Sequence, residues 1–339
     1  MTTAAKLIDE YTKLEPRITK LYVVPKINYD NKTTDYLYRL YKSFILNETK
    51  TFFNLESLSV FAHPKFAWKR LLGEKNVLHY HWFECKDIKS FFGIIWKIKW
   101  LVFYKLIGGK IVWTIHNKYP HTRKYTALNR ILRKQLSRLS NRIHVHCESC
   151  IGELAAMFEC SKDKFFVLEH PSFQPEMMDR VTAGSFLKEN YSMPLPNDRS
   201  KLFLMFGNIA GYKGILECIN IFKNLNRDKC LLVAGGVKKG NEDYLNEIIN
   251  AAGDSDNIFI INKIIPDREV PYFINSADFM LFNFTEILTS GSVHLALSYN
   301  KPVIIPKLGC LNELKGEKIF CFDAGTDRIK NLKDLLLRL

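Results

Sequence analysis

Short apolar runs alternate with stretches of helical periodicity through the first half of the chain. An apolar run bounded by turn residues is typical of a buried strand, and apolar residues recurring every three or four positions are typical of an amphipathic helix. Strands are expected at residues 18–25, 57–63, 76–84, 110–117, 142–147 and 164–171. Helices are expected within residues 28–46, 86–110, 126–139 and 149–158. Because strand–helix–strand units build parallel sheets, the alternation predicts a doubly wound, Rossmann-like domain.

A second alternation of the same kind begins at residue 201, after a break in the pattern. Residues 171–200 are rich in Pro, Ser and Asn and are predicted to be a linker with one short helix. The later strands are expected at residues 201–209, 229–237, 257–264, 279–284 and 302–306. The later helices are expected at residues 214–225, 242–252, 269–277, around 293–297 and at 327–339. We therefore predict an α/β fold of two Rossmann-like domains facing a cleft, with boundaries at 1–170 and 201–339.

A loop of small polar residues joins the expected strand at 279–284 to the helix that follows it. Ligands of open α/β sheets bind where strands end and helices begin, and the free N–H groups and dipole of a helix start favour a phosphate. A tight turn capped by a serine or threonine is the alternative from the residues alone. The candidate anion-binding residues are Thr289, Ser290, Gly291 and Ser292.

The turn after the strand at 201–209 also carries residues suited to a phosphate. Gly207 allows the backbone to approach a ligand closely, and Asn208 follows it. Lys213 stands at the start of the next helix, where its ammonium group suits a diphosphate. A surface lysine in an ordinary turn is the alternative.

Two residues of the first half are candidates for catalysis. His116 follows the strand at 110–117, and an imidazole there can donate a hydrogen bond to a ligand hydroxyl or share a proton. A histidine with a purely structural role is the alternative. His79 and His81 lie on one face of the strand at 76–84, and Glu84 ends it. Glu84 is a candidate base for a substrate hydroxyl, with a surface carboxylate as the alternative.

Positive charge is concentrated in one region. The net charge is +14, and thirteen Lys or Arg without a single acid lie between Ile88 and Cys147. The remainder of the chain is balanced, with 36 basic residues against 35 acidic ones. Such a region should meet nucleic acid, anionic lipid or a phosphorylated substrate. His121 and Arg123 lie in its central loop and are candidates for contact with an acceptor.

The helix at 86–110 has aromatic residues at roughly helical spacing with lysines beside them. The residues expected at an acceptor or membrane surface are Lys97, Lys99, Trp100 and Lys105. Such a pattern is typical of a helix lying in a membrane interface, and three lysines make it a poor transmembrane span. The alternative is a helix packed over the sheet, with its lysines extending to water. Arg133 and Lys134 continue the charge in the helix at 126–139, where Ile131, Leu132 and Leu136 are expected to face inward.

The N-terminus, the cysteines and the absence of some motifs narrow the expected cellular compartment and the class of function. The N-terminus has acidic residues and no apolar segment of the signal-peptide kind, and the eight cysteines are scattered as in reduced proteins, so a cytoplasmic protein is expected. Cys147 and Cys150 form one CxxC without a second pair, with His144 and His146 before it. Four such close residues cannot readily surround a zinc ion, so no metal site is predicted. A glycine-rich dinucleotide motif is absent after the first strand.

The stretch LTSGSVHLALSYNKPVI, residues 288–304, resembles the donor-binding segment of GT-B glycosyltransferases. The resemblance is to the family 4 (group 1) enzymes of bacterial exopolysaccharide and capsule assembly. Further segments resemble the same family in the same order: HYHWFE, VWTIHNKYPH, LEHPSF, FGNIAGYKG and IPDREVPYFINSADFMLF. Together they span about residues 18 to 325. The resemblance implies the two-domain GT-B fold and transfer of a sugar from a nucleotide-diphosphate donor.

The family's binding residues are only partly present. The resemblance implies that His116 contacts the donor sugar beside the reacting carbon and that Lys213 contacts the diphosphate. An arginine of the family is replaced here by Asn208 or Ala210. The first of two glutamates spaced eight apart matches Glu286, but the second is absent, because His294 or Leu295 stands there. The small polar loop is then expected to hold the diphosphate, with Lys213 and helix dipoles stabilising the leaving group.

We therefore predict a hexosyltransferase that acts peripherally at the cytoplasmic face of a membrane in surface polysaccharide synthesis. Its donor would be a UDP- or GDP-linked sugar, bound without a further cofactor, and its acceptor a lipid-linked glycan. Binding to an anionic membrane surface is expected, and binding to nucleic acid is not, because the basic stretch contains apolar strands and no recognition motif. The alternatives are a GT-B-like sugar-nucleotide epimerase, an inactive binding scaffold and, less favoured, a nucleic-acid-binding protein.

Overall fold

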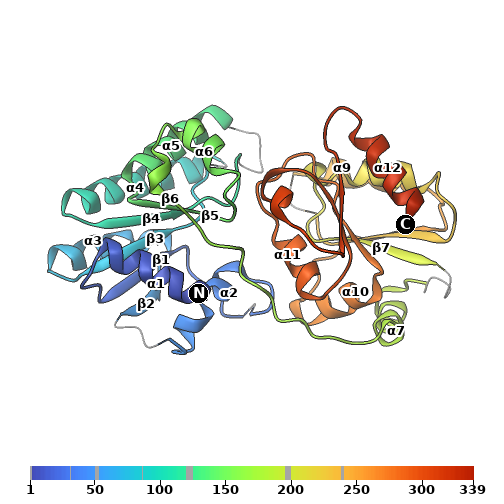
Figure 1. Cartoon of the computed structure of the whole chain (residues 1–339), viewed down its shortest axis with the longest axis horizontal. Coiled ribbons are helices and arrows are strands. Elements are labelled where there is room, and N and C mark those ends of the chain that lie inside the picture. Colours follow the sequence, from blue (N-terminus) through green and yellow to red (C-terminus); the bar gives the residue numbers. More distant parts are fainter. Residues whose placement is uncertain are drawn as a thin grey trace. The chain divides into compact units, whose positions relative to one another are not determined.

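The chain forms two compact units, Met1–Pro171 and Ser172–Leu339, in the computed structural model. The structure describes residues 2–30, 32–49, 53–85, 87–119, 125–194, 200–237 and 240–339. Each unit is built on a parallel sheet with helices on both of its faces (Figure 1). The predicted α/β fold with two doubly wound sheets is thus confirmed.

The sheet of the first unit has the strand order β2-β1-β3-β4-β5-β6 among the described residues, and all neighbouring strands are parallel. Its strands are β1 (Lys20–Val24), β2 (Asn54–Ser57), β3 (Asn76–Tyr80), β4 (Lys110–Thr114), β5 (Arg142–Val145) and β6 (Phe165–Val167). The strand order reverses between β1 and β3. The carboxyl ends of strands beside such a reversal are where doubly wound sheets bind ligands.

Helices cover both faces of the first sheet (Figure 1). They are α1 (Thr3–Leu14), α2 (Tyr36–Ile45), α3 (His63–Leu71), α4 (Ile88–Leu106), α5 (Thr126–Leu139) and α6 (Ile151–Phe158). The first two pack on one face, where Leu7 and Tyr11 of α1 and Tyr41 of α2 share a core with Val23 of β1. The other four lie on the opposite face, where, for example, Trp113 of β4 packs edge-on against Phe158 of α6. Because successive side chains of a strand point to opposite faces of the sheet, each side chain at a strand end lies beside one of these two helix layers.

The sheet of the second unit has the order β12-β11-β10-β7-β8-β9 within the described part of the chain, again parallel throughout. Its strands are β7 (Lys201–Phe206), β8 (Lys229–Ala234), β9 (Ile258–Ile261), β10 (Phe279–Leu281), β11 (Val303–Pro306) and β12 (Ile319–Phe322). The order reverses between β7 and β10. The loops after these two strands therefore flank the expected ligand position of this unit.

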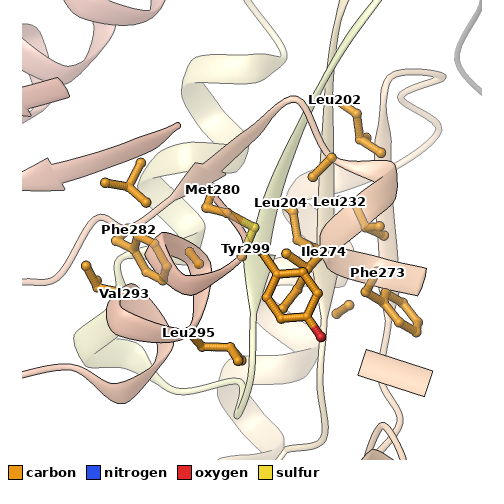
Figure 2. Close-up of a cluster of buried hydrophobic side chains, with 14 of the residues drawn as sticks. Leu202, Leu204, Leu232, Phe273, Ile274, Met280, Phe282, Val293, Leu295 and Tyr299 are labelled. Carbon is orange, nitrogen blue, oxygen red and sulfur yellow. The ribbon is translucent and has the colours of Figure 1, made fainter. Parts of the chain in front are cut away.

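Two apolar layers hold the helices of the second unit against its sheet. The helices are α7 (Arg180–Tyr191), α8 (Ile215–Phe222), α9 (Glu242–Ala252), α10 (Val270–Ser276), α11 (Gly291–Ser298) and α12 (Arg328–Arg338). One layer, seen in Figure 2, joins Phe273 of α10 and Val293 of α11 to Leu204 of β7. The other joins α8, α9 and α12 to the opposite face. Burial of both faces explains why the strands appear as continuous apolar runs.

Three local features differ from the sequence prediction or were absent from it. The strand predicted at 57–63 is wrong, because β2 ends at Ser57 and residues Val60–Ala62 form a 3₁₀ turn that leads into α3. Phe61 in this turn is 86% exposed. Pro64 occupies the first turn of α3, where a missing N–H costs nothing. Helix α1 was not predicted, and α7, within the predicted linker, packs against α10.

The inward face of α5 is more polar than predicted. Leu132 and Leu136 are buried as expected, but Ile131 is 57% exposed. The buried positions beside them are taken by Asn129, Arg133 and Ser137. Each of the three donates hydrogen bonds to backbone carbonyls of other segments, so hydrogen bonding compensates for their burial.

Candidate functional site

In the second unit, Gly207 and Lys213 lie together at the carboxyl end of β7. Gly207 has a φ of +92°, a left-handed conformation that glycine adopts without strain. A β-carbon placed on it would lie 3.1 Å from Nζ of Lys213 and 3.6 Å from Oγ of Ser292. Lys213 is 8% exposed, and its ammonium donates to the carbonyl of Phe206 at 2.9 Å. The ammonium group of Lys213 and the hydroxyl of Ser292 thus lie close to Gly207, which has no side chain to block a ligand.

The loops after β7 and β10 are held together by a buried asparagine. Asn283 is fully buried and its amide donates to the carbonyl of Gly214 at 2.9 Å. Gly214 has a φ of +61°, and a β-carbon there would lie 2.4 Å from the carbonyl of Asn283, so no larger residue fits. Arg328 of α12 donates to the Asn283 side-chain oxygen at 2.5 Å. The backbone N–H of Thr285 also donates to the carbonyl of Tyr212 at 2.8 Å. These bonds fix the position of Lys213 relative to the loop after β10.

The predicted anion-binding loop leads into the N-terminus of α11. Ser290 caps this helix, and its hydroxyl accepts a hydrogen bond from the N–H of Val293 at 3.4 Å. The Oγ1 atom of Thr289 is buried without a hydrogen-bond partner in the described part of the chain. Gly291 and Ser292 are half-buried in the first turn. The cap and the anion site were alternatives from the sequence, and here the capping Ser290 lies two residues before Ser292, the residue that approaches Gly207.

Three other sequence candidates of the second unit lie around this point. Asn208 is exposed directly after Gly207, and Glu286 is half-buried in the loop after β10. His294, which with Leu295 is one of two residues that match the missing family glutamate, lies in α11, and burial lowers the pKa of its imidazole to about 4. A neutral imidazole can still donate or accept a hydrogen bond, but it carries no charge at neutral pH.

In the first unit, His116 lies just past the end of β4 among aromatic rings. It stacks on Trp82 with ring centroids 4.3 Å apart and planes 12° apart, and Tyr36 meets it edge-on at 4.6 Å. Its Nε2 atom lies 3.1 Å from Nδ1 of His81. Burial, with the neighbouring His146 as a further cause, lowers the pKa of His116 well below its ordinary value. It is therefore a neutral, half-exposed imidazole held in one orientation.

Behind His116, buried histidines join the ends of three strands. His79 of β3 lies 2.6 Å from the hydroxyls of both Tyr11 and Tyr41, and its other nitrogen lies 2.7 Å from Thr114 of β4. Thr114 in turn lies 2.9 Å from His144 of β5. Burial lowers the pKa of His79 to about 3, so this cluster is uncharged at neutral pH. His144 and His146, considered above as metal ligands, both lie within 3.1 Å of the carbonyl of Leu168.

Glu84 forms a buried ion pair. One of its oxygens lies 2.8 Å from Nη2 of Arg133, and both side chains are 6% exposed. The same guanidinium donates to the carbonyls of Asn117 at 2.8 Å and Lys118 at 3.0 Å. Glu84 is thus placed to hold Arg133, and through it the loop that follows His116. This geometry favours positioning over proton transfer at Glu84, because its carboxylate is engaged by Arg133 in a buried ion pair.

The lysines of α4 have different surroundings. Lys99 is exposed, and Lys97 lies 5.7 Å from the ring centre of Phe83. Lys105 is half-buried and donates to the side chain of Asn141 at 2.6 Å, and burial lowers its pKa to about 8. Trp100 is half-buried, with its ring 5.6 Å from that of Trp96. His121 and Arg123 lie outside the described residues.

Part of the basic charge of the first unit is paired with acids from other segments. Arg142 contacts Glu10 at 2.7 Å, and Lys118 and Lys134 form ion pairs with Glu153 and Glu159. Exposed apolar side chains lie instead on α4, on α3 packed beside it, and on the turn before α3. They include Phe61, Trp68, Leu71, Leu72, Phe92, Ile95 and Trp96. None of the helices in the described ranges has the length and apolar character needed to span a bilayer.

Several residues of these sites were not found by sequence reasoning. Tyr41 and Asn283 appear as ordinary members of a helix and a strand pattern, and Tyr11 lies in a helix that was not predicted. The burial of their polar atoms depends on partners distant in sequence. The distance from Tyr11 to His79 along the chain is 68 residues. Only the HYH spacing, which places His79 and His81 on one strand face, was a usable signal.

Comparison with known proteins gives one family match and several similar folds. Residues 188–338 match the family model described as glycosyl transferases group 1. HepE of Anabaena, solved in complex with UDP and glucose, has a TM-score of 0.66 and 12% identity, covering 95% of this chain and 89% of HepE. Sucrose-phosphate synthase of Thermosynechococcus elongatus has a TM-score of 0.64 and 12% identity, with the same two coverages. No curated protein matches the sequence significantly.

A third similar structure comes from Rickettsia africae. This glycosyltransferase has a TM-score of 0.59 and 14% identity, covering 95% of this chain and 93% of its own. At such identities the likeness concerns the fold, whereas the family match concerns the sequence of the second unit, which contains Lys213 and the loop of Thr289 to Ser292.

Proposed function

We propose that this glycosyltransferase uses a nucleotide-diphosphate sugar bound to its second unit. Residues 188–338 match the model of the group 1 glycosyl transferases, and the chain has the GT-B fold that the sequence resemblance implies. The observation that carries the proposal is the convergence of Gly207, Lys213 and Ser292 beside the reversal of strand order. An ammonium group, a hydroxyl and a helix N-terminus are the groups that bind phosphate. HepE, which shares the fold, was solved with UDP-glucose, and this supports a UDP-linked donor.

In this proposal the diphosphate lies against the loops after β7 and β10. Lys213 contacts a phosphate oxygen, and the first turn of α11 with Ser290 and Ser292 faces the other phosphate. Glu286 and Asn208 contribute around the nucleotide. Developing negative charge on the leaving nucleoside diphosphate is stabilised by fixed donors that need no reorganisation during the reaction. His116 of the first unit contacts the sugar at the reacting carbon. We propose no cofactor or metal ion.

Replacing Lys213 with alanine tests the donor site. Lys213→Ala is expected to weaken binding of UDP or GDP by about 1.5–3 kcal/mol, the range for a hydrogen bond to a charged group. Titration calorimetry measures this directly, with circular dichroism as the check on folding. Lys223→Ala is the matched control, because Lys223 also donates to a backbone carbonyl in this unit but is exposed outside the site. Equal affinities of the Lys213 variant and the unaltered protein would remove Lys213 from the site.

Analysis of the reaction products distinguishes a transferase from a sugar-nucleotide epimerase and from an inactive binding scaffold. Donor candidates that stabilise the protein in a thermal-shift assay are incubated with lipid-linked oligosaccharides, and the products are identified by mass spectrometry. Transfer with release of the nucleoside diphosphate supports the proposal. Binding of a nucleotide sugar followed only by a change in the sugar would indicate an epimerase. Binding without any conversion would indicate a scaffold.

For the acceptor, we propose a lipid-linked glycan reached at the inner face of a membrane, as a step of surface polysaccharide synthesis. The support is the face formed by α3 and α4, where exposed Trp68, Phe92 and Trp96 lie on two packed helices together with Lys69 and Lys99. Aromatic side chains beside lysines suit the interface of an anionic bilayer. We propose that His121 and Arg123 of the basic region contact the acceptor's phosphate groups.

Vesicle co-sedimentation tests this surface. The protein is expected to sediment with anionic but not neutral vesicles at low salt, and less at high salt, because surface charges are screened over about 8 Å at physiological ionic strength. Replacing Lys69, Lys97 and Lys99 with glutamine should weaken binding by up to about 3 kcal/mol, at about 1 kcal/mol for each lysine near the surface. The control replaces exposed Lys315, Lys330 and Lys333 of the second unit. Equal loss in both triple variants would mean that only net charge matters and that α3 and α4 are not the contact.

A further inference from the structure

The donor and acceptor roles in the hydrogen bonds behind His116 can be assigned one by one, starting from the carbonyl of Leu168. A carbonyl only accepts, so Nε2 of His144, 3.1 Å away, carries a proton. Burial lowers the pKa of His144 well below its ordinary value, so the ring is neutral and its Nδ1 has no proton. The hydroxyl of Thr114, at 2.9 Å, therefore donates to that nitrogen.

The same reasoning fixes His79. Because the Thr114 proton points to His144, the Thr114 oxygen accepts from Nε2 of His79 at 2.7 Å. His79 is neutral, so its Nδ1 accepts a hydrogen bond. The hydroxyls of Tyr11 and Tyr41 both lie 2.6 Å from this atom, but its single lone pair takes one of them in a directed bond.

The Tyr41 hydroxyl can donate to either of two nitrogens, and it shares one of them, Nδ1 of His79, with Tyr11. The Tyr41 hydroxyl also lies 3.0 Å from Nε2 of His81. When Tyr11 donates to His79, Tyr41 donates to His81, and each hydroxyl has its own nitrogen. His81 is neutral because burial lowers its pKa, so its proton lies on Nδ1, 3.1 Å from Nε2 of His116. His116 then accepts at Nε2 and carries its own proton on Nδ1.

We propose that Tyr41 and His81 are positioning residues that fix His116 with its Nδ1–H as a hydrogen-bond donor to the donor sugar. This inference rests on the proposed role of His116 at the sugar. Nδ1 of His116 has no hydrogen-bond partner within the described ranges, so it is available to a ligand. The stacked ring of Trp82 and the edge of Tyr36 hold the plane of the imidazole, while His81 selects the protonated nitrogen.

The chain of bonds is not suited to carrying a proton away. With Tyr11 donating to His79, the chain from His116 ends at the hydroxyl of Tyr41, which cannot take up a proton at neutral pH. A proton entering at His116 would remain as a positive charge on one of the buried rings, and burial disfavours that charge. The arrangement therefore sets orientation and tautomer and does not act as a proton relay.

Kinetics of variants at His81 and Tyr41 test the proposal. His81→Leu leaves Nε2 of His116 without its donor, and kcat is expected to fall roughly 5- to 150-fold, the cost of an unsatisfied polar group. Tyr41→Phe should lower kcat by up to about 10-fold, the value of one neutral hydrogen bond. His81→Asn places an amide nitrogen near the Nδ1 position and should restore most of the lost rate. KM for the nucleotide sugar and affinity for UDP should stay unchanged, because the nucleotide binds to the second unit.

A double-mutant cycle distinguishes positioning from a general structural role. In a His116→Ala background, adding Tyr41→Phe or His81→Leu should cause no further loss, because both act through the missing imidazole. Losses that multiply in the double variants would overturn the proposal. A His81→Asn variant no better than His81→Leu would also overturn it.

Nitrogen-15 NMR of the histidines tests the inference without any activity. The His116 ring should be neutral with its proton on Nδ1 in the unaltered protein, and should become a mixture of tautomers in Tyr41→Phe. A proton found on Nε2 in the unaltered protein would overturn the proposed direction. Failure to transfer any sugar, with the expected tautomer observed, would count against the proposed function and leave the positioning of His116 intact.

Discussion

Replacing His116 with alanine is expected to lower the turnover number by about 10²- to 10⁴-fold, the usual contribution of a positioned acid–base or hydrogen-bonding group. Affinity for UDP should remain within about twofold, because the groups proposed to bind the phosphates belong to the second unit and His116 to the first. Burial lowers its pKa, so the imidazole acts in its neutral form at pH 7. Single-turnover kinetics and calorimetry on the same variant measure the two quantities separately.

A second histidine provides the control for this experiment. His170 is also half-buried, and its ring lies 5.1 Å from Tyr36, but its Nδ1 lies 3.0 Å from the carbonyl of Pro171. His170→Ala removes an imidazole from the same surroundings and should lower turnover far less. A His116→Ala variant with normal turnover would show that His116 is a structural histidine. A large loss of UDP affinity would instead assign it to nucleotide binding.

Replacing Glu84 with glutamine is expected to destabilise the first unit by about 3–5 kcal/mol. The substitution keeps the shape of the side chain but leaves the guanidinium of Arg133 buried without its counter-charge, and breaking a buried ion pair costs about this much. The midpoint of thermal unfolding should fall by roughly 6–20 °C for a unit of this size. Urea unfolding followed by circular dichroism gives the free energy.

Two comparisons make this result specific. Glu153→Gln removes the partner of Lys118 in an exposed pair, which should cost less than about 1 kcal/mol. Replacing both Glu84 and Arg133 with apolar residues of similar size should cost less than Glu84→Gln alone, since no buried charge remains. If Glu84→Gln changed stability by less than 1 kcal/mol while abolishing transfer, Glu84 would act as the catalytic base that the sequence first indicated.

The location of both sites could be predicted from the sequence because strand ends are local features. Gly207 and Lys213 follow an apolar run, and Thr289 to Ser292 separate another run from a helix. In a parallel sheet all carboxyl ends meet at one edge, so residues at these positions gather whatever their distance along the chain. The family match confirms the glycosyltransferase assignment, while the contributions of the individual residues stay predictions.

Partners within the sites could not be predicted in the same way. The sequence analysis considered Glu84 as a base or a surface carboxylate, yet it is buried, and its partner is Arg133, 49 residues further on. Ile131 was expected inside α5, but Arg133 and Asn129 are buried instead, because their polar groups bind backbone atoms of loops that pack there. Helical periodicity records the balance of apolar residues and cannot show which polar group will find a partner.

The sequence by itself therefore determined the two α/β units, their approximate limits and the strand ends where ligands would bind. These follow from periodicity and from the chirality of parallel crossovers, which act over tens of residues at most. Tertiary structure decided the neutral histidine chain, the pairing of Glu84 and the joining of two loops by Asn283. These features depend on buried hydrogen bonds between distant segments, and the strength of such bonds depends on the water-excluding interior that the folded sheet and helices create.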